Sequence, residues 1–378
     1  MFDYETLRLI WWAILGVLLI GFAVMDGFDL GVGAIFRFVG RNDEERRVLL
    51  ETVEPVWEGN QVWFILGGGA AFAAWPLLYA AAFSGLYLAL FLVLIALILR
   101  PVGFTFRGHV DDARWRNVWD WALFVGGAAP ALLFGVAFGN LLLGIPFHFD
   151  ELRRPVYTAG FFNLLHPFAL LAGIVSLSML VMHGATYAAL KIDRSLASRA
   201  AAVGRVGALV LIVAFVMAGF WIATGIDGHR IVSEINTAGP SNPVAKGVEL
   251  IRGGWLENYR AHASLWIVPG LALAMALVTE RLLNRGRYGL AFLSSALAVA
   301  GVILTAGIAM FPFLMPSSIQ PGHGLTIWDA SSSAKTLGIM LVAVIVFLPI
   351  VLAYTSWVFR TLRGEVTLEH VRRQSGLY

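Results

Sequence analysis

Nine long apolar stretches, separated by shorter polar or basic segments, make up most of this chain. A helix needs roughly 20 apolar residues to cross a bilayer, and each stretch is long enough to do so. We therefore predict an all-α, polytopic integral membrane protein with nine transmembrane helices. The predicted spans are residues 9–36, 50–72, 77–99, 118–142, 160–189, 203–226, 263–283, 289–312 and 334–359.

The segments between the spans predict how the chain is oriented. Nineteen of the 27 lysine and arginine residues fall in or at the edges of the breaks after the first, third, fifth and seventh spans and in the C-terminal tail. Because basic residues favour the cytoplasmic side, we expect an outer N-terminus and a cytoplasmic C-terminus. The longest break, residues 226–263, is then an extracytoplasmic loop, with room for one short helix. We expect residues 1–378 to form a single transmembrane domain without a soluble one.

Composition excludes several classes of cofactor and partner. The chain is 59% hydrophobic and only 13% charged, and it has no cysteine. The absence of cysteine excludes disulfides, cysteine-bound iron–sulfur clusters and thiolate-bound haem within this chain. The net charge is +3 and the basic residues are scattered, so nucleic-acid binding has no support.

Two carboxylates, Asp26 and Asp29, lie inside the first span. A charged residue near the middle of a membrane helix costs roughly 2.5 to 3.5 kcal/mol on insertion scales and usually serves protons, ions or ligands. Their spacing of three places both on one helix face. Glu58 is expected at a similar depth, and Arg100 closes the third span on the same side. We therefore predict that three carboxylates and one cation converge in the cytoplasmic half.

Each of these residues also has a structural interpretation. Asp26 and Asp29 could form an ion pair or cap a kink at Gly27 instead of relaying protons. Glu58 could lie at the membrane interface if the second span begins later, and Arg100 could be an interfacial anchor.

The other polar and aromatic residues indicate a function less specifically than the carboxylates do. Residues near Glu58 are expected to pack or to bond across helices, with quinone or oxygen-path contacts as the alternative; these are Trp57, Asn60, Gln61 and Trp63. His166 and His183 are the histidines placed in a span. They are 17 residues apart, roughly 25 Å along a helix, so they cannot bind one iron together. No metal-ligand spacing occurs, and we predict no metal site.

Two further segments predict the ends of helices. Before the last span, Asp329 or a following serine is expected to cap the helix N-terminus, with Trp328 at the outer interface. At the other side, cationic and aromatic residues precede the fourth span and form an anchoring belt, namely Arg114, Trp115, Arg116, Trp119 and Trp121.

Several long motifs occur in a family-specific order. They are DGFDLGVG (26–33), GRNDEERR (40–47), WEGNQVW (57–63), FAAWPLLYAAAFSGLYLAL (72–90), LRPVGFTFR (99–107), RWRNVWDW (114–121), GVAFGNLLLG (135–144), TAGIAMFPFLMPSS (305–318) and LTIWDASSS (325–333). Together they resemble subunit II of the cytochrome bd family of quinol oxidases, and the resemblance runs from about residue 3 to Tyr378. One departure is Glu58, where the family motif has aspartate, so the carboxyl group is one methylene further from the backbone.

The resemblance implies a fold, partners and a reaction. The nine helices would form two four-helix bundles plus one peripheral helix. The partner would be subunit I, which carries b- and d-type haems and oxidises quinol, and small single-span accessory subunits could join. The complex would lie in a bacterial inner membrane, reduce dioxygen to water with cytoplasmic protons and generate a proton-motive force. Asp29 and Glu58, with Asp26 and Arg100 nearby, would belong to the proton path, and Trp63 to an oxygen route. A structural quinone is a candidate cofactor.

Two alternatives remain beside this interpretation. A proton- or sodium-coupled secondary transporter would also use buried carboxylates, although no later span repeats the acidic break of the first. A structural scaffold would use them only for packing. In the oxidase interpretation, the chain is not expected to be catalytic without its haem-bearing partner.

Overall fold

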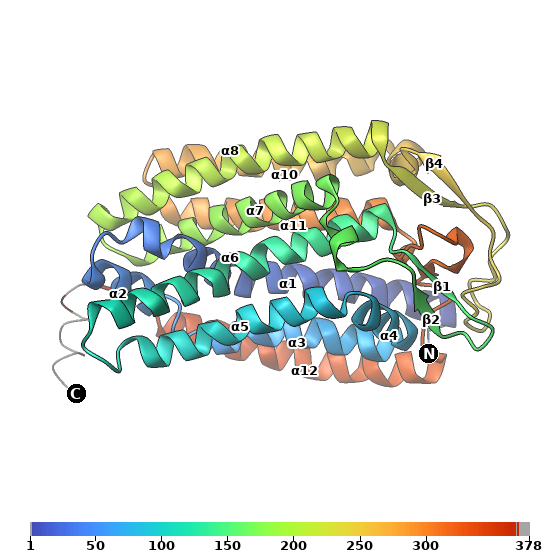
Figure 1. Ribbon diagram of the computed structural model, residues 1–378, viewed down its shortest axis with the longest axis horizontal. Helices are drawn as coiled ribbons and strands as arrows, with labels where there is room; N and C mark the ends of the chain where they lie inside the picture. The colour runs from blue at the N-terminus through green and yellow to red at the C-terminus, as the bar shows by residue number, and fades with distance from the viewer. Residues whose placement is uncertain (1, 368, 370–378) are drawn as a thin grey trace.

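The structure is a computed structural model that describes residues 2–367 and 369. Its long helices run along one axis, and the N-terminus and the strands lie together at one end of the bundle (Figure 1). Eight helices in the described part are long and apolar enough to cross a membrane. They are α1 (Tyr4–Val39), α5 (Tyr87–Arg107), α6 (Ala113–Leu143), α7 (Pro167–Lys191), α8 (Arg194–Gly225), α10 (Ile267–Asn284) with the preceding turn η3 (Ala263–Trp266), α11 (Tyr288–Met310) and α12 (Ala334–Thr361).

The ninth candidate span is broken. Helix α3 (Trp57–Ala74) is followed by α4 (Pro76–Gly85), and the two are bent by 118° at Trp75. Pro76 supplies the first residue of α4, where the missing N–H costs nothing. The prediction of an all-α membrane protein is confirmed, whereas the division into two four-helix bundles and a peripheral helix stays a prediction.

Helix ends differ from the sequence prediction at the second and third spans. Residues 43–51 form a separate helix, α2 (Asp43–Glu51), capped by Asn42, so the second span begins at Trp57 and not near residue 50. The third is interrupted at Leu86 and continues to Arg107 instead of ending at 99. It continues because Arg100 is buried and paired inside the protein, so its charge does not end the helix.

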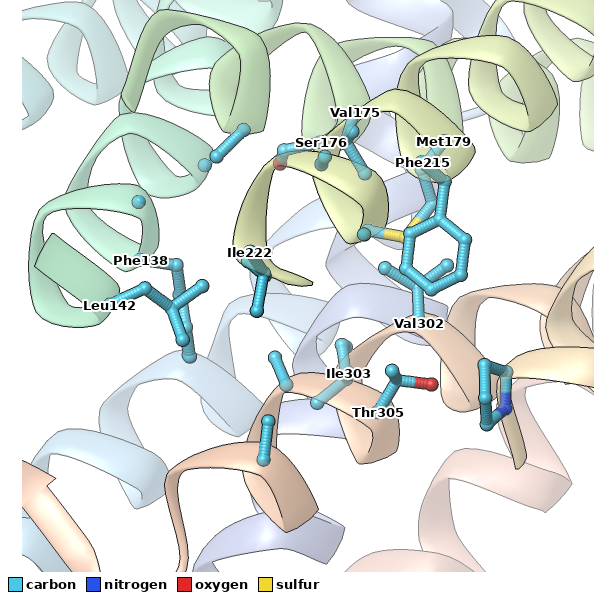
Figure 2. Close-up of a pocket in the computed structure, with 18 of the residues that line it drawn as sticks. Phe138, Leu142, Val175, Ser176, Met179, Phe215, Ile222, Val302, Ile303 and Thr305 are labelled. Atoms are coloured by element: carbon cyan, nitrogen blue, oxygen red, sulfur yellow. The ribbon is translucent and has the colours of Figure 1, made fainter. Parts of the chain in front are cut away.

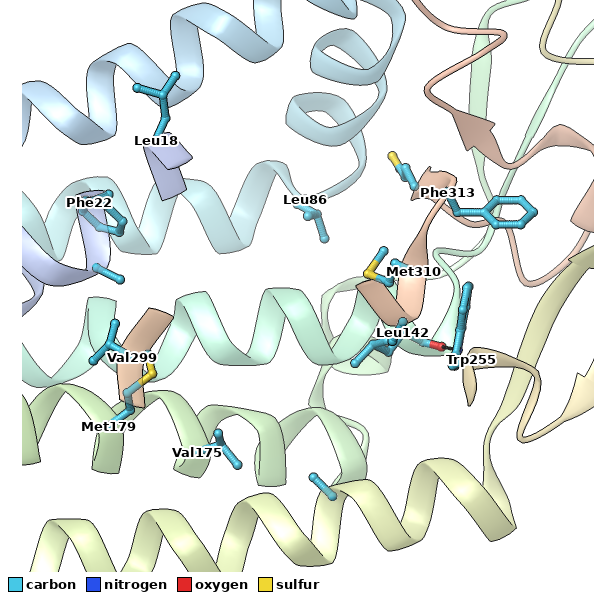
Figure 3. Close-up of a cluster of buried hydrophobic side chains, with 14 of the residues drawn as sticks. Leu18, Phe22, Leu86, Leu142, Val175, Met179, Trp255, Val299, Met310 and Phe313 are labelled. Atoms are coloured by element: carbon cyan, nitrogen blue, oxygen red, sulfur yellow. Dashed lines mark hydrogen bonds between the residues drawn. The ribbon is translucent and has the colours of Figure 1, made fainter. Parts of the chain in front are cut away.

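Helix α1 lies at the centre and packs against α3, α6, α7 and α11. Glycines allow this close contact. A Cβ atom added to Gly31 would lie 2.0 Å from the carbonyl oxygen of Leu180, and one added to Gly184 would lie 2.5 Å from Gly31. The backbones of α1 and α7 therefore touch, as small residues allow in membranes. Figure 3 shows part of the apolar core around this helix, including Leu18 and Phe22.

The end that carries the N-terminus holds short connections. Three two-stranded antiparallel sheets are formed by β1 (Phe147–Phe149) with β2 (Pro155–Tyr157), β3 (Asp227–Ile231) with β4 (Val248–Arg252), and β5 (Phe313–Met315) with β6 (Leu325–Thr326). Short helical segments complete this end, namely η1 (Phe161–Leu165), η2 (Gly254–Leu256), α9 (Glu257–Ala261) and η4 (Pro321–His323). The 226–263 loop thus contains the expected short helix and a hairpin that the sequence did not predict.

Buried ionic groups attach this loop to the helices. Arg8 of α1 is fully buried and donates to the carbonyl oxygens of Thr237 and Gly239 at 2.5 and 3.0 Å. Lys246 of the loop lies 2.7 Å from Asp329, and burial lowers the pKa of Lys246. Asp329 is therefore an ion-pair partner and not the helix cap. Ser333 caps α12, which agrees with the alternative of a following serine.

Candidate functional site

Four polar side chains from three helices meet inside the protein. Arg100 of α5 donates to both oxygens of Asp26, at 3.0 and 3.4 Å, and lies 4.0 Å from Oδ2 of Asp29. Asn60 of α3 donates to the same Oδ2 of Asp29 at 2.8 Å. None of the four residues is more than 3% exposed. We call these residues the carboxylate cluster.

Local sequence places each member. Asp26 and Asp29 are three residues apart on α1 and so share a face. Arg100 has space beside α6 because position 126 is glycine, where a Cβ would lie 3.0 Å from the Arg100 side chain. Asn60 lies in the first turn of α3, which carries it against α1.

The cluster contains two acids and one base. Arg100 neutralises Asp26 through a bidentate pair, which is the strong geometry for this contact. Asp29 receives one neutral hydrogen bond on Oδ2, and its buried Oδ1 has no partner within the described residues. Arg100 lies 4.0 Å from Oδ2 of Asp29, so Asp29 is paired less closely than Asp26.

Glu58 does not join the cluster in this chain. It lies in the first turn of α3 and is exposed, while Asn60 of the same turn points inward. The expected convergence thus holds for Asp26, Asp29 and Arg100 and fails for Glu58. The reason is helical geometry: Asn60 faces Asp29 of α1, and Glu58, two residues earlier, is rotated by about 200° around the helix and lies on the surface of the chain.

The aromatic candidates around α3 have packing contacts. The Trp57 ring stacks on Phe104 with centroids 6.0 Å apart and lies 5.7 Å from the Arg100 guanidinium. Trp63 is buried against α1, where a Cβ at Gly21 would lie 2.3 Å from its ring. Gln61 is half-buried. Quinone or oxygen contacts of these residues stay a prediction.

A second ionic cluster, which the sequence analysis missed, joins α2, α5 and α6. Asp120 is 1% exposed and accepts from Arg107 at 2.7 Å and from Arg46 at 2.9 Å. Arg107 also donates to Asp43 at 2.6 Å. The sequence analysis missed it because the third span was predicted to end at residue 99, which placed Arg107 in a loop.

A large apolar cavity of about 460 Å³ lies between α6, α7, α8, α10 and α11 (Figure 2). Phe138, Met179, Phe215 and Ile222 are among the side chains that face it, and Ser176 and Thr305 add hydroxyl groups. The residues at 57, 60, 61 and 63 do not line it. The cavity suits a flexible hydrocarbon chain more than a polar substrate.

Comparison with known proteins agrees with the motifs. The model of the family described as cytochrome bd terminal oxidase subunit II matches residues 7–362. The chain belongs to this family. It is 50% identical to the cytochrome bd-I ubiquinol oxidase subunit 2 of Escherichia coli K12, over 99% of both chains. It is 32% identical to the cytochrome bd ubiquinol oxidase subunit 2 of Bacillus subtilis, over 96% of this chain and 97% of the relative.

The fold agrees with this family as well. A chain of the bd oxidase from Geobacillus thermodenitrificans superposes with a TM-score of 0.69 at 17% identity, covering 94% of this chain and 98% of that one. This subunit II is therefore a membrane component of a respiratory oxidoreductase complex. Family membership favours the oxidase over the secondary-transporter alternative.

The buried histidine of α7 does not fit haem ligation. His183 is fully buried with both ring nitrogens engaged, one with the carbonyl of Val24 at 2.9 Å and one with Ser295 at 2.7 Å. His166 lies outside the span, contrary to the prediction, and its Nδ1 caps α7. No group of three potential metal ligands occurs among the described residues.

Proposed function

We propose that this chain is subunit II of a quinol:dioxygen oxidoreductase. It supports a haem-bearing subunit I and supplies part of the route by which cytoplasmic protons reach the oxygen-reducing site. The names of the relatives and the shared family support the reaction. The arrangement of Asp29 beside an already paired Asp26 supports the proton route, and it is the observation on which this assignment depends.

The proposed role of the carboxylate cluster follows from its charges. Arg100 holds Asp26 as a fixed ion pair, and Asn60 orients one oxygen of Asp29. The other oxygen of Asp29 is free to take up and release a proton. Glu58 acts nearer the protein surface as an entry group, where the partner subunit covers it. The deciding measurement is the quinol oxidase turnover of assembled complexes that carry Asp29→Asn.

The exposed face of α3 is the proposed contact with subunit I. Glu58, Ile65, Gly69 and Phe72 are exposed at helical spacing along this face, and a Cβ at Gly69 would meet no neighbour within 4 Å. A carboxylate and a glycine on one membrane-facing stripe are unfavourable against lipid but typical of helix–helix contacts.

Gly69→Leu should therefore reduce assembly, because the larger side chain prevents close approach of a partner helix. Gly270→Leu is the matched control, since Gly270 of α10 is also exposed, has no neighbour within 4 Å and does not line the apolar cavity. We expect several-fold less haem to co-purify with tagged Gly69→Leu protein and parental amounts with Gly270→Leu. Equal haem yields from both variants would contradict this docking face.

The proposed orientation places α2 in the cytoplasm and the 226–263 loop outside. The chain has no cysteine, so the labelling of an introduced cysteine shows the location of that position alone. Val244→Cys in the loop should react with an impermeant thiol reagent added to intact cells from outside. Glu44→Cys in α2 should react only after the inner membrane is opened. The reverse pattern would show that the orientation is inverted.

The structural quinone is proposed to occupy the apolar cavity and not the Trp57–Trp63 segment. The cavity has room for an isoprenoid chain, and its lining is almost wholly hydrocarbon. Small single-span accessory subunits are also part of the proposal, on the basis of the family resemblance.

A further inference from the structure

Arg37, in the last turn of α1, has a guanidinium whose charge is poorly balanced. Its Nη1 lies 3.9 Å from Oδ2 of Asp120. Both oxygens of Asp120 already accept hydrogen bonds, from Arg107 at 2.7 Å and Arg46 at 2.9 Å. Within the described residues, the buried Nη1 of Arg37 has no hydrogen-bond partner.

The other two guanidiniums have further acceptors. Arg107 also reaches Asp43, and Arg46 donates to the carbonyl oxygen of Gly40 at 3.1 Å. Three cations thus share one buried carboxylate, and Arg37 is the most distant of them. A planar guanidinium with spare donors is well suited to bind a phosphate through two parallel hydrogen bonds.

The surface beside Arg37 is apolar and exposed. Its guanidinium lies 4.2 Å from the Trp121 ring centroid, and Trp121 is 46% exposed. Phe38 is 64% exposed and packs edge-on against Phe124, which in turn contacts Trp121. Val118 of α6 is also exposed, about one turn from Trp121. A cation next to tryptophan at the end of a span lies at headgroup depth, with apolar rings at acyl-chain depth.

We propose that Arg37, Phe38, Trp121 and Phe124 bind an anionic phospholipid, and we call them the anionic-lipid site. The phosphodiester accepts from the accessible side of the Arg37 guanidinium, and an acyl chain lies along the exposed rings. Basic pockets between membrane helices bind anionic headgroups in this way. A zwitterionic headgroup is disfavoured, because its own cation would add to the positive charge around Asp120. This site is independent of the proposed proton route.

The first test compares Arg37→Gln with Arg114→Gln in the purified complex. Arg114 is an exposed arginine in the first turn of α6, at the same end of the molecule. A lipid bound at this site would stabilise only the folded form, so phosphatidylglycerol should raise the melting temperature of the parent and of Arg114→Gln by several degrees. Arg37→Gln should lose most of this increment, and Arg37→Lys should keep part of it. Phosphatidylcholine and inorganic phosphate should give no comparable increment.

A second measurement does not depend on the stability of Arg37→Gln. The photoreactive residue p-benzoylphenylalanine in place of Phe38 should cross-link to phosphatidylglycerol in mixed vesicles, and mass spectrometry should identify the adduct. Adducts in proportion to the lipid mixture, or with a peptide of the partner subunit, would overturn the proposal. Equal increments for Arg37→Gln and Arg114→Gln, or an equal effect of inorganic phosphate, would overturn it too.

Discussion

Asp29→Asn is expected to reduce quinol oxidase turnover at least about tenfold, which corresponds to a barrier increase of roughly 1.4 kcal/mol. The substitution keeps the size of the side chain and its contact with Asn60, which lies 2.8 Å away. It removes the group that exchanges a proton. Arg100 remains paired with Asp26, so the complex should assemble and keep its haems. Turnover per haem, measured as oxygen consumption, checks the expectation.

The controls separate a relay from a general disturbance of the membrane domain. Glu280→Gln removes another carboxylate in a spanning helix, one paired with Arg205 at 2.8 Å, and should leave turnover unchanged. Glu58→Gln should slow turnover like Asp29→Asn, whereas Glu58→Asp should retain much of the activity. In flow experiments the slowed step should be proton-coupled decay of the oxygen intermediate. Parental turnover in assembled Asp29→Asn and Glu58→Gln complexes would leave only the structural role.

Spacing along one helix predicted much of the carboxylate cluster. Asp26 and Asp29 share a face because the helix period places residues three apart together, and this needs no tertiary information. The approach of Arg100 was predicted from depth alone, and the structure confirms it. Asn60 was expected only to bond across helices, and its acceptor is Asp29. Depth in the membrane does not specify the rotation of a helix about its axis. For this reason Glu58 was predicted to face inward, whereas the structure places it on the surface.

The sequence was less informative wherever a charge is buried with its partner. A hydropathy pattern treats Arg100 and Arg107 as the end of a span, yet both lie within α5 because carboxylates of other helices neutralise them. The same holds for Asp120, which was counted only within a boundary motif. The hairpin of β3 and β4 was missed because its strands lack a clear alternation of apolar and polar residues. Pairing partners distant in sequence decide these features.

Arg100→Gln should be the most damaging single substitution in the carboxylate cluster. It leaves Asp26 buried without its cation, and breaking a buried ion pair on one side typically costs about 3–5 kcal/mol. Glutamine is also too short to restore the bidentate contact, which the two guanidinium nitrogens make at 3.0 and 3.4 Å. We expect a large loss of assembled, haem-containing complex, measured by size-exclusion chromatography with haem absorbance, and a lower melting temperature for the remainder.

The double variant Asp26→Asn with Arg100→Gln distinguishes an ion pair from a packing role. Removing both charges deletes the unpaired carboxylate, so the double variant should recover most of the assembly that Arg100→Gln loses, as expected when the penalty comes from a buried charge. Because Asp29 is untouched, the recovered complex should also retain measurable turnover. If the double variant assembles no better than Arg100→Gln, the guanidinium acts mainly through its packing against Trp57, and its pairing with Asp26 contributes little to folding.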